Sequence, residues 1–90
     1  MIKATLKHIN TRIKTEEIEL PNGFNTGDII SVIANAMENF DYDDCMDRDV
    51  FEISLETGLV FHCYELSFYK YRLYEETPDG EYEWVADFTF

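Results

Sequence analysis

The stretch Thr26–Phe40, TGDIISVIANAMENF, decides the fold of this 90-residue chain. From Ile29 onward its apolar residues recur at helical spacing, a pattern typical of a helix that covers a core. They form a stripe of Ile29, Ile33, Ala36, Met37 and Phe40, widened by Ile30 and Ala34. Thr26 or Asp28 provides N-cap chemistry. The sequence therefore predicts one amphipathic helix of about four turns that ends near Phe40.

Two strands are predicted before this helix, within Ile2–Leu20. Apolar and polar residues alternate in both, and Asn10-Thr11 is the expected turn between them. Ile13 is out of phase with the apolar residues of the second strand, so a bulge near residues 15–17 is expected. Pro21-Asn22-Gly23 then breaks the chain before the helix.

Strands and turns alternate after the helix. The alternation in Phe51–Leu55 predicts a half-buried strand, and Thr57-Gly58 predicts a tight turn. The segment Leu59–Glu76 is strand-like throughout, with a bulge or sharp bend expected near Ser67–Tyr69. Thr77–Gly80 is a strong turn signal. We expect the last strand to place five residues on one face: Tyr82, Trp84, Ala86, Phe88 and Phe90.

The order of these elements is β-β-α-β-β-β, with five or six strands. One amphipathic helix can cover one face of an antiparallel sheet. The sequence therefore predicts a two-layer α+β fold, in which a five- to six-stranded antiparallel sheet carries one helix. Because the chain has the size of one small domain and no linker interrupts it, residues 1–90 are expected to form a single domain.

Charge is unevenly distributed along the chain. The formal net charge is -12, from 7 Lys and Arg against 19 Asp and Glu. Residues 1–14 hold four basic residues and no acidic one, so residues 15–90 carry 19 acidic and 3 basic residues. This acidity argues against direct binding to nucleic acid or to anionic membranes, because phosphate affinity needs a basic surface. The start of the chain lacks the apolar stretch of a signal peptide, and we expect a cytoplasmic protein.

Two short stretches concentrate the carboxylates. Residues 41–56 contain seven, and residues 75–87 contain six. Self-repulsion on this scale costs stability, which favours a functional surface, although the solvated face of a one-sided sheet is an alternative. Alternate residues of a strand lie about 6.7 Å apart, similar to successive phosphates of a nucleic acid. The candidate partner-binding residues are Asp41, Asp43, Asp44, Asp47, Asp49, Glu52, Glu75, Glu76, Glu81 and Glu83.

In length, acidity, aromatic content and lack of a catalytic motif, the chain resembles the small acidic inhibitors of phages and mobile elements. These are the DNA-mimic anti-restriction proteins and the anti-CRISPR proteins. The resemblance implies a partner protein with a basic, nucleic-acid-binding channel that the inhibitor blocks by DNA mimicry or occlusion. An immunity or antitoxin-like protein, or an accessory interaction module, would need the same acidity but a partner that does not bind nucleic acid.

The sequence predicts neither an enzyme nor a cofactor. It contains no Ser-His-Asp arrangement and no glycine loop that could cradle a phosphate. Cys45 and Cys63 are expected to be structural thiols, and His8 to lie at the surface. The carboxylates from Asp41 onward approach the spacing of a calcium-binding loop, but Met46 stands where that loop requires glycine, so no metal site is predicted. Because the final strand could pair across a dimer, both a monomer and a homodimer are compatible with the sequence.

Overall fold

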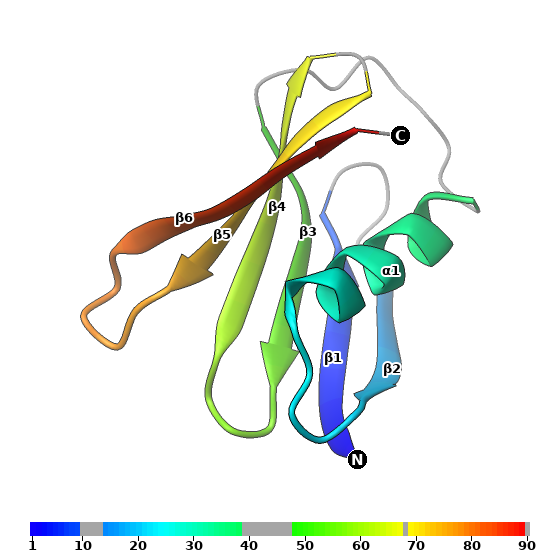
Figure 1. Ribbon diagram of the computed structural model, residues 1–90, viewed down its shortest axis with the longest axis vertical. Helices are drawn as coiled ribbons and strands as arrows, with labels where there is room; N and C mark the ends of the chain where they lie inside the picture. Colours follow the sequence, from blue (N-terminus) through cyan, green and yellow to red (C-terminus); the bar gives the residue numbers. More distant parts are fainter. Residues whose placement is uncertain (10–13, 39–47, 68, 90) are drawn as a thin grey trace.

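The computed structural model describes residues 1–9, 14–38, 48–67 and 69–89 (Figure 1). These residues form six antiparallel strands and one helix, which confirms the predicted α+β class. The elements are β1 (Ile2–His8), β2 (Lys14–Leu20), α1 (Thr26–Met37), β3 (Arg48–Leu55), β4 (Val60–Ser67), β5 (Lys70–Glu76) and β6 (Tyr82–Thr89).

The six strands form one sheet in the order β2-β1-β3-β4-β5-β6. Both β2 and β3 pair antiparallel with β1, so they run parallel to each other and cannot be joined by a tight hairpin. The segment that contains α1 makes this connection past β1, and α1 lies across one face of the sheet (Figure 1). The remaining strands follow in chain order as successive hairpins.

The N-terminus of α1 is fixed by a capping box. Asn25 has an extended backbone, and its side chain accepts a hydrogen bond of 3.0 Å from the backbone N–H of Asp28. Asp28 in turn accepts a bond of 2.9 Å from the backbone N–H of Asn25. The N-cap is therefore Asn25, and the prediction of Thr26 or Asp28 as the N-cap is wrong. The helix ends at Met37, and Phe40, the predicted end, lies outside the described residues.

The core lies between α1 and the sheet face that the helix covers, which we call the inner face. The helix contributes Ile29, Ile33 and Ala36, as its apolar stripe predicts. One inner row of the sheet runs from β3 to β6 through paired residues: Phe51, Cys63, Leu73 and Ala86. Cys63 is a free thiol with 1% exposure. Burial is the main cause of its raised pKa, which opposes thiolate chemistry.

A bulge in β6 changes which residues face the core. Leu73 pairs with Ala86, but the next residue, Tyr74, pairs with Trp84, so Val85 is an extra residue in β6. Ala86 therefore points to the inner face, whereas Trp84 points to the opposite face. The predicted single row of aromatic residues along this strand is wrong. The bulge allows the C-terminal half of β6 to pack on the core while its N-terminal half presents aromatic rings to solvent.

Two other expected irregularities differ from the structure. The bulge predicted near residues 15–17 is absent from β2, because the β1–β2 register runs unbroken from Ile2 opposite Leu20 to His8 opposite Lys14. The bend predicted near Ser67–Tyr69 is a full hairpin reversal between β4 and β5, where Tyr69 adopts a positive φ of 61°. The turns predicted at residues 57–58 and 77–80 are both present as hairpin connections.

Candidate protein-binding face

The sheet face opposite α1, which we call the outer face, carries rings and carboxylates in ordered rows. Directly paired residues of neighbouring strands point to the same face. The central row from β3 to β6 is Glu52, His62, Tyr74 and Trp84. The row nearer the β5–β6 turn is Ser54, Val60, Glu76 and Tyr82. The row on its other side is Asp49, Tyr64, Arg72 and Asp87. The strand register thus gathers these residues from separate parts of the chain.

His62 lies beneath Tyr82 on this face. Their ring centroids are 4.4 Å apart and the rings are nearly parallel, at 19°. His62 is only 5% exposed, and neither ring nitrogen has a hydrogen-bond partner among the described residues. Its Nε2 is 3.6 Å from Oε1 of Glu76, which is too far for a hydrogen bond. The stack fixes the Tyr82 ring against the sheet.

Carboxylates from β3 and β5 act electrostatically on the hydroxyl of Tyr82. Loss of hydration at this site and the negative charges of Glu76, Asp49 and Glu52 raise the pKa of Tyr82. Glu76 belongs to the acidic stretch of residues 75–87, whereas Asp49 and Glu52 belong to the stretch of residues 41–56. Both stretches therefore act on one aromatic side chain.

Trp84 is held at its edge by a carboxylate. Its Nε1–H donates a hydrogen bond of 2.9 Å to Oδ1 of Asp87. Arg72 donates to both oxygens of the same carboxylate, at 2.7 Å from Nε and 3.0 Å from the terminal nitrogen. These bonds lower the pKa of Asp87 to about 2 and raise that of Arg72. The indole is oriented, yet Trp84 remains 61% exposed.

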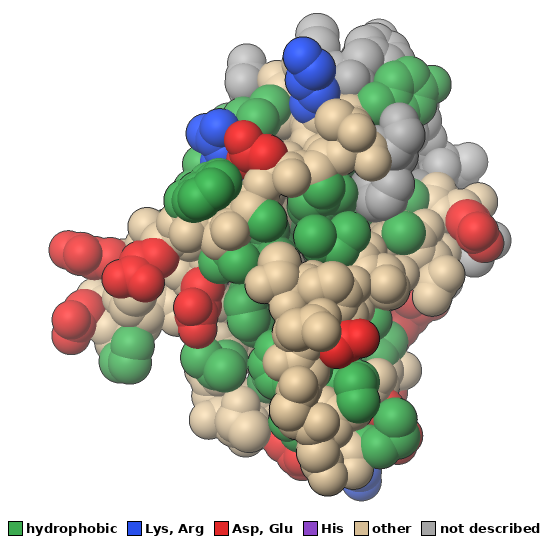
Figure 2. All heavy atoms as spheres, viewed as in Figure 1, with side chains coloured by type: hydrophobic (Ala, Val, Ile, Leu, Met, Phe, Trp, Pro, Cys, Tyr) green, Lys and Arg blue, Asp and Glu red, His purple; other side chains and the backbone are tan. Residues whose placement is uncertain are grey.

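The β5–β6 hairpin projects from the body of the molecule (Figure 1) and forms an acidic arm. We use the name acidic hairpin for residues 75–83, which include Glu75, Glu76, Asp79, Glu81 and Glu83. Figure 2 shows acidic side chains gathered at the projecting end of these strands. Glu75 and Glu83 lie directly opposite each other. In the described part of the chain, no Lys or Arg forms an ion pair with Glu75, Asp79, Glu81 or Glu83.

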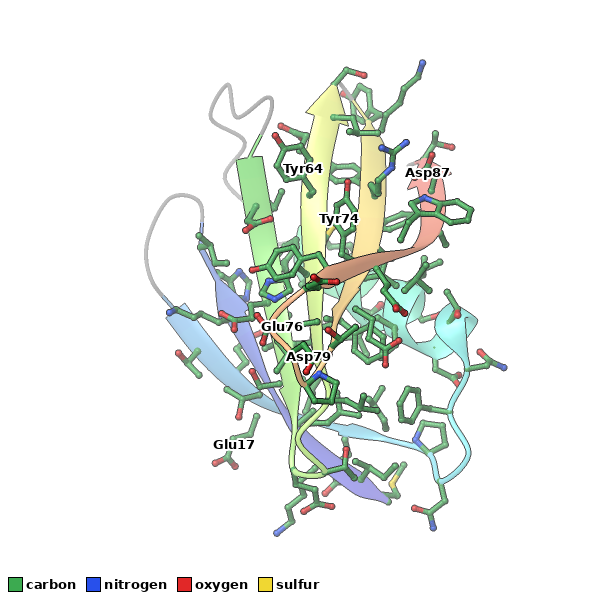
Figure 3. The ribbon with its side chains drawn as sticks, turned by 90° about the vertical axis from the view of Figure 1, so that its left-hand side faces the viewer. Glu17, Tyr64, Tyr74, Glu76, Asp79 and Asp87 are labelled. Carbon is green, nitrogen blue, oxygen red and sulfur yellow. The ribbon has the colours of Figure 1, made fainter. Side chains whose placement is uncertain are left out.

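The structure places six of the ten predicted partner-binding residues. Asp49 and Glu52 lie in β3, and the other four belong to the acidic hairpin: Glu75, Glu76, Glu81 and Glu83. Figure 3 looks onto this side of the molecule, with Tyr64, Tyr74, Glu76 and Asp79 in view. The remaining four lie outside the described residues: Asp41, Asp43, Asp44 and Asp47.

The sequence reasoning missed the aromatic half of this face. Tyr82 and Trp84 were expected on the same face as Ala86 and Phe88, because strict alternation puts these residues in phase. The only sequence signal against that expectation is the acidity of their neighbours, Glu81 and Glu83. The burial of His62 beneath Tyr82 depends on the register of β4, β5 and β6 together.

A cleft with a volume of about 350 Å³ lies between α1 and strands β1 and β2. His8 lines it and is only 8% exposed, so the prediction of a surface position is wrong. Its Nε2 is 3.3 Å from Oε2 of Glu16. Apolar groups supply much of the remaining lining, from Leu6, Ile18, Val32 and Ala36. We assign no chemistry to this cleft, because its lining offers no nucleophile beside the His–Glu pair.

No group of three or more His, Cys, Asp or Glu within the described ranges could hold a metal ion. No helix of the described residues is long and apolar enough to cross a membrane. Comparisons with protein-family models, curated proteins and solved structures find no match to this chain. The proposals below therefore rest on the geometry and charge of this chain alone.

Proposed function

We propose that this protein is a small acidic inhibitor that occupies a basic channel of a nucleic-acid-processing protein. The partner class we favour is a host-defence nuclease of the restriction or CRISPR type, in the cytoplasm of the host cell. The inhibitor works by occlusion or DNA mimicry: its carboxylates take the place of phosphates. The observation that carries this proposal is the acidic hairpin, an extended arm in which four carboxylates have no Lys or Arg partner among the described residues: Glu75, Asp79, Glu81 and Glu83.

The pairing of Glu75 with Glu83 supports this proposal. Like charges directly opposite on neighbouring strands destabilise a sheet. A cationic surface relieves that repulsion on binding, because it compensates both carboxylates at once. Uncompensated charge also speeds association with an oppositely charged surface, at a rate that falls as salt rises. The unfavourable pair is thus understandable in a protein that meets a basic partner.

The test is inhibition of purified restriction enzymes and CRISPR effector complexes, measured as DNA cleavage over a range of salt concentrations. The variant Glu81→Gln/Glu83→Gln removes two exposed charges from the acidic hairpin. Its matched control, Glu17→Gln/Glu19→Gln, removes two exposed charges from β2. We expect the hairpin variant to weaken inhibition by roughly three- to tenfold, since each exposed ion pair is worth up to about 1 kcal/mol.

Equal effects of the two variants would contradict a specific role for the acidic hairpin. Retention of bound DNA or guide RNA by the inhibited partner would contradict occlusion of its channel.

A second candidate function is an immunity or antitoxin-like module whose basic partner does not bind nucleic acid. The exposure of Tyr82 and Trp84 favours it, because aromatic side chains dominate the energetics of protein–protein interfaces and phosphate mimicry does not need them. Competition distinguishes the two functions. Added DNA displaces an inhibitor from a nucleic-acid channel but leaves an immunity complex intact.

A further inference from the structure

We infer that the outer face around Tyr82 and Trp84 binds arginine side chains of a basic partner segment. A guanidinium would stack on the exposed rings and pair with the surrounding carboxylates. This inference rests on the proposed function, in that the partner is basic, and it adds which basic residue the face recognises. The docking surface consists of Tyr74, Tyr82, Trp84, Asp49, Glu52 and Glu76.

Exposed aromatic area is the first observation behind this inference. Tyr82 is 50% exposed and Trp84 is 61% exposed, and Trp84 is the single tryptophan of the chain. Large rings that remain in water on a small domain mark an interaction surface. Among the aromatic side chains, tryptophan attracts a cation placed over its ring most strongly.

Orientation of the rings is the second observation. Trp84 donates its indole N–H to Asp87, and Arg72 fixes that carboxylate through two bonds, so the indole is oriented while the side chain stays exposed. Tyr82 is held by its stack on His62, and its centroid is 6.2 Å from that of Tyr74. Rings that are already fixed lose little conformational entropy when a partner binds.

Negative charge around the rings selects a cationic occupant. The carboxylates of Glu76, Asp49 and Glu52 act on the Tyr82 hydroxyl from β5 and β3. They repel the phosphates of a nucleic acid, so the rings are unsuited to stacking bases. A second copy of this chain is also disfavoured, because it carries the same net charge of -12.

The geometry favours arginine over lysine. A guanidinium is flat, stacks on aromatic rings and pairs with a carboxylate through two parallel bonds, whereas an ammonium is a compact, strongly hydrated charge. The face already holds one guanidinium through such a pair of bonds, since Arg72 binds both oxygens of Asp87, the carboxylate that also accepts from Trp84. Further carboxylates remain for an incoming side chain.

The test compares oligo-arginine and oligo-lysine peptides of equal length at low salt. Fluorescence of Trp84 reports binding directly, and the NMR signal of its indole N–H reports whether the ring is the contact. We expect the arginine peptide to bind about two- to fivefold more tightly, in keeping with cation–π interactions at partly exposed sites. The Trp84 indole signal should shift with the arginine peptide in particular.

A pair of variants separates ring recognition from charge. Trp84→Leu keeps an apolar side chain but removes the π-system, so it should abolish the preference for arginine while salt-dependent binding persists. Tyr69→Leu is the matched control, because Tyr69 is also exposed, at 56%, but lies at the β4–β5 turn. Binding of this variant is followed with labelled peptides, as is that of Trp84→Leu.

Equal affinity of the two peptides for the unaltered protein would overturn the inference, and so would an unchanged preference in Trp84→Leu. Those outcomes leave the proposed function standing if Glu81→Gln/Glu83→Gln still weakens inhibition. Conversely, an arginine preference without inhibition of any nucleic-acid enzyme would support this inference and contradict the proposed function.

Discussion

His62 has an unfavourable environment on the outer face. Its ring is buried beneath Tyr82, and both nitrogens lack hydrogen-bond partners among the described residues. A buried polar group without a partner costs about 1–3 kcal/mol, whereas an apolar replacement of similar shape carries no such cost. His62→Phe keeps a flat ring under Tyr82, so we expect the free energy of unfolding to rise by about 1 kcal/mol.

Chemical denaturation of His62→Phe and the unaltered protein measures this difference. His62→Ala is the control: it removes the ring altogether, leaves Tyr82 without its stacking partner and should lower stability. A less stable His62→Phe would mean that the 3.6 Å contact with Glu76 outweighs the cost of burying the imidazole.

At the scale of the elements, the β5–β6 hairpin carries like charges that lower its stability but favour binding of a basic partner. Glu83→Lys places a positive charge opposite Glu75, which should stabilise the hairpin by about 0.2–1 kcal/mol. The same change should weaken inhibition, because it puts a positive charge on the acidic hairpin. Arginine-peptide binding should change little, because Glu83 shares the face of Glu75 and Phe61 rather than that of Trp84. Glu19→Lys is the mirror-image control in β2: it faces Lys3 and should lower stability instead.

Thermal unfolding of both variants, measured beside inhibition of the partner, tests this opposition. If Glu83→Lys improved stability and inhibition together, the carboxylate at this position would have no role in binding the partner.

The elements also differ in how far sequence alone defines them. The helix stripe and the turns at Gly58 and Gly80 are local, since adjacent residues determine a helical period or supply a positive φ. The bulge at Val85 is not local, because it accompanies the packing of Val85 and Phe88 against the core, whereas Trp84 lies on the opposite face. That is why Tyr82 and Trp84 do not share a face with Phe88, as strict alternation predicted.

In the candidate site, the sequence identifies the acidic residues but not their arrangement in space. Counting charges was enough to single out Asp49, Glu52 and Glu76, but only the register of four strands brings them to Tyr82. Long-range pairing of this kind leaves no periodic signal in the chain.

At the scale of the whole molecule, the net charge of -12 opposes folding. Raising NaCl from about 0.01 M to about 0.15 M shortens the screening length from about 30 Å to about 8 Å. Repulsion between distant carboxylates should then fall, and the thermal midpoint should rise. Each 1 kcal/mol of relief corresponds to about 4–8 °C for a domain of this size.

The salt dependence should also show where the repulsion resides. Glu81→Gln/Glu83→Gln removes charges that the described residues leave uncompensated, whereas Glu17→Gln/Glu19→Gln removes charges that face Lys3 and Thr5 of β1. Thermal unfolding at both salt concentrations should therefore give a smaller salt-induced rise for the hairpin variant than for the β2 variant. Identical rises would mean that the repulsion is spread evenly over the surface. The acidic hairpin would then carry no more uncompensated charge than β2, and a partner would gain nothing by binding there in particular.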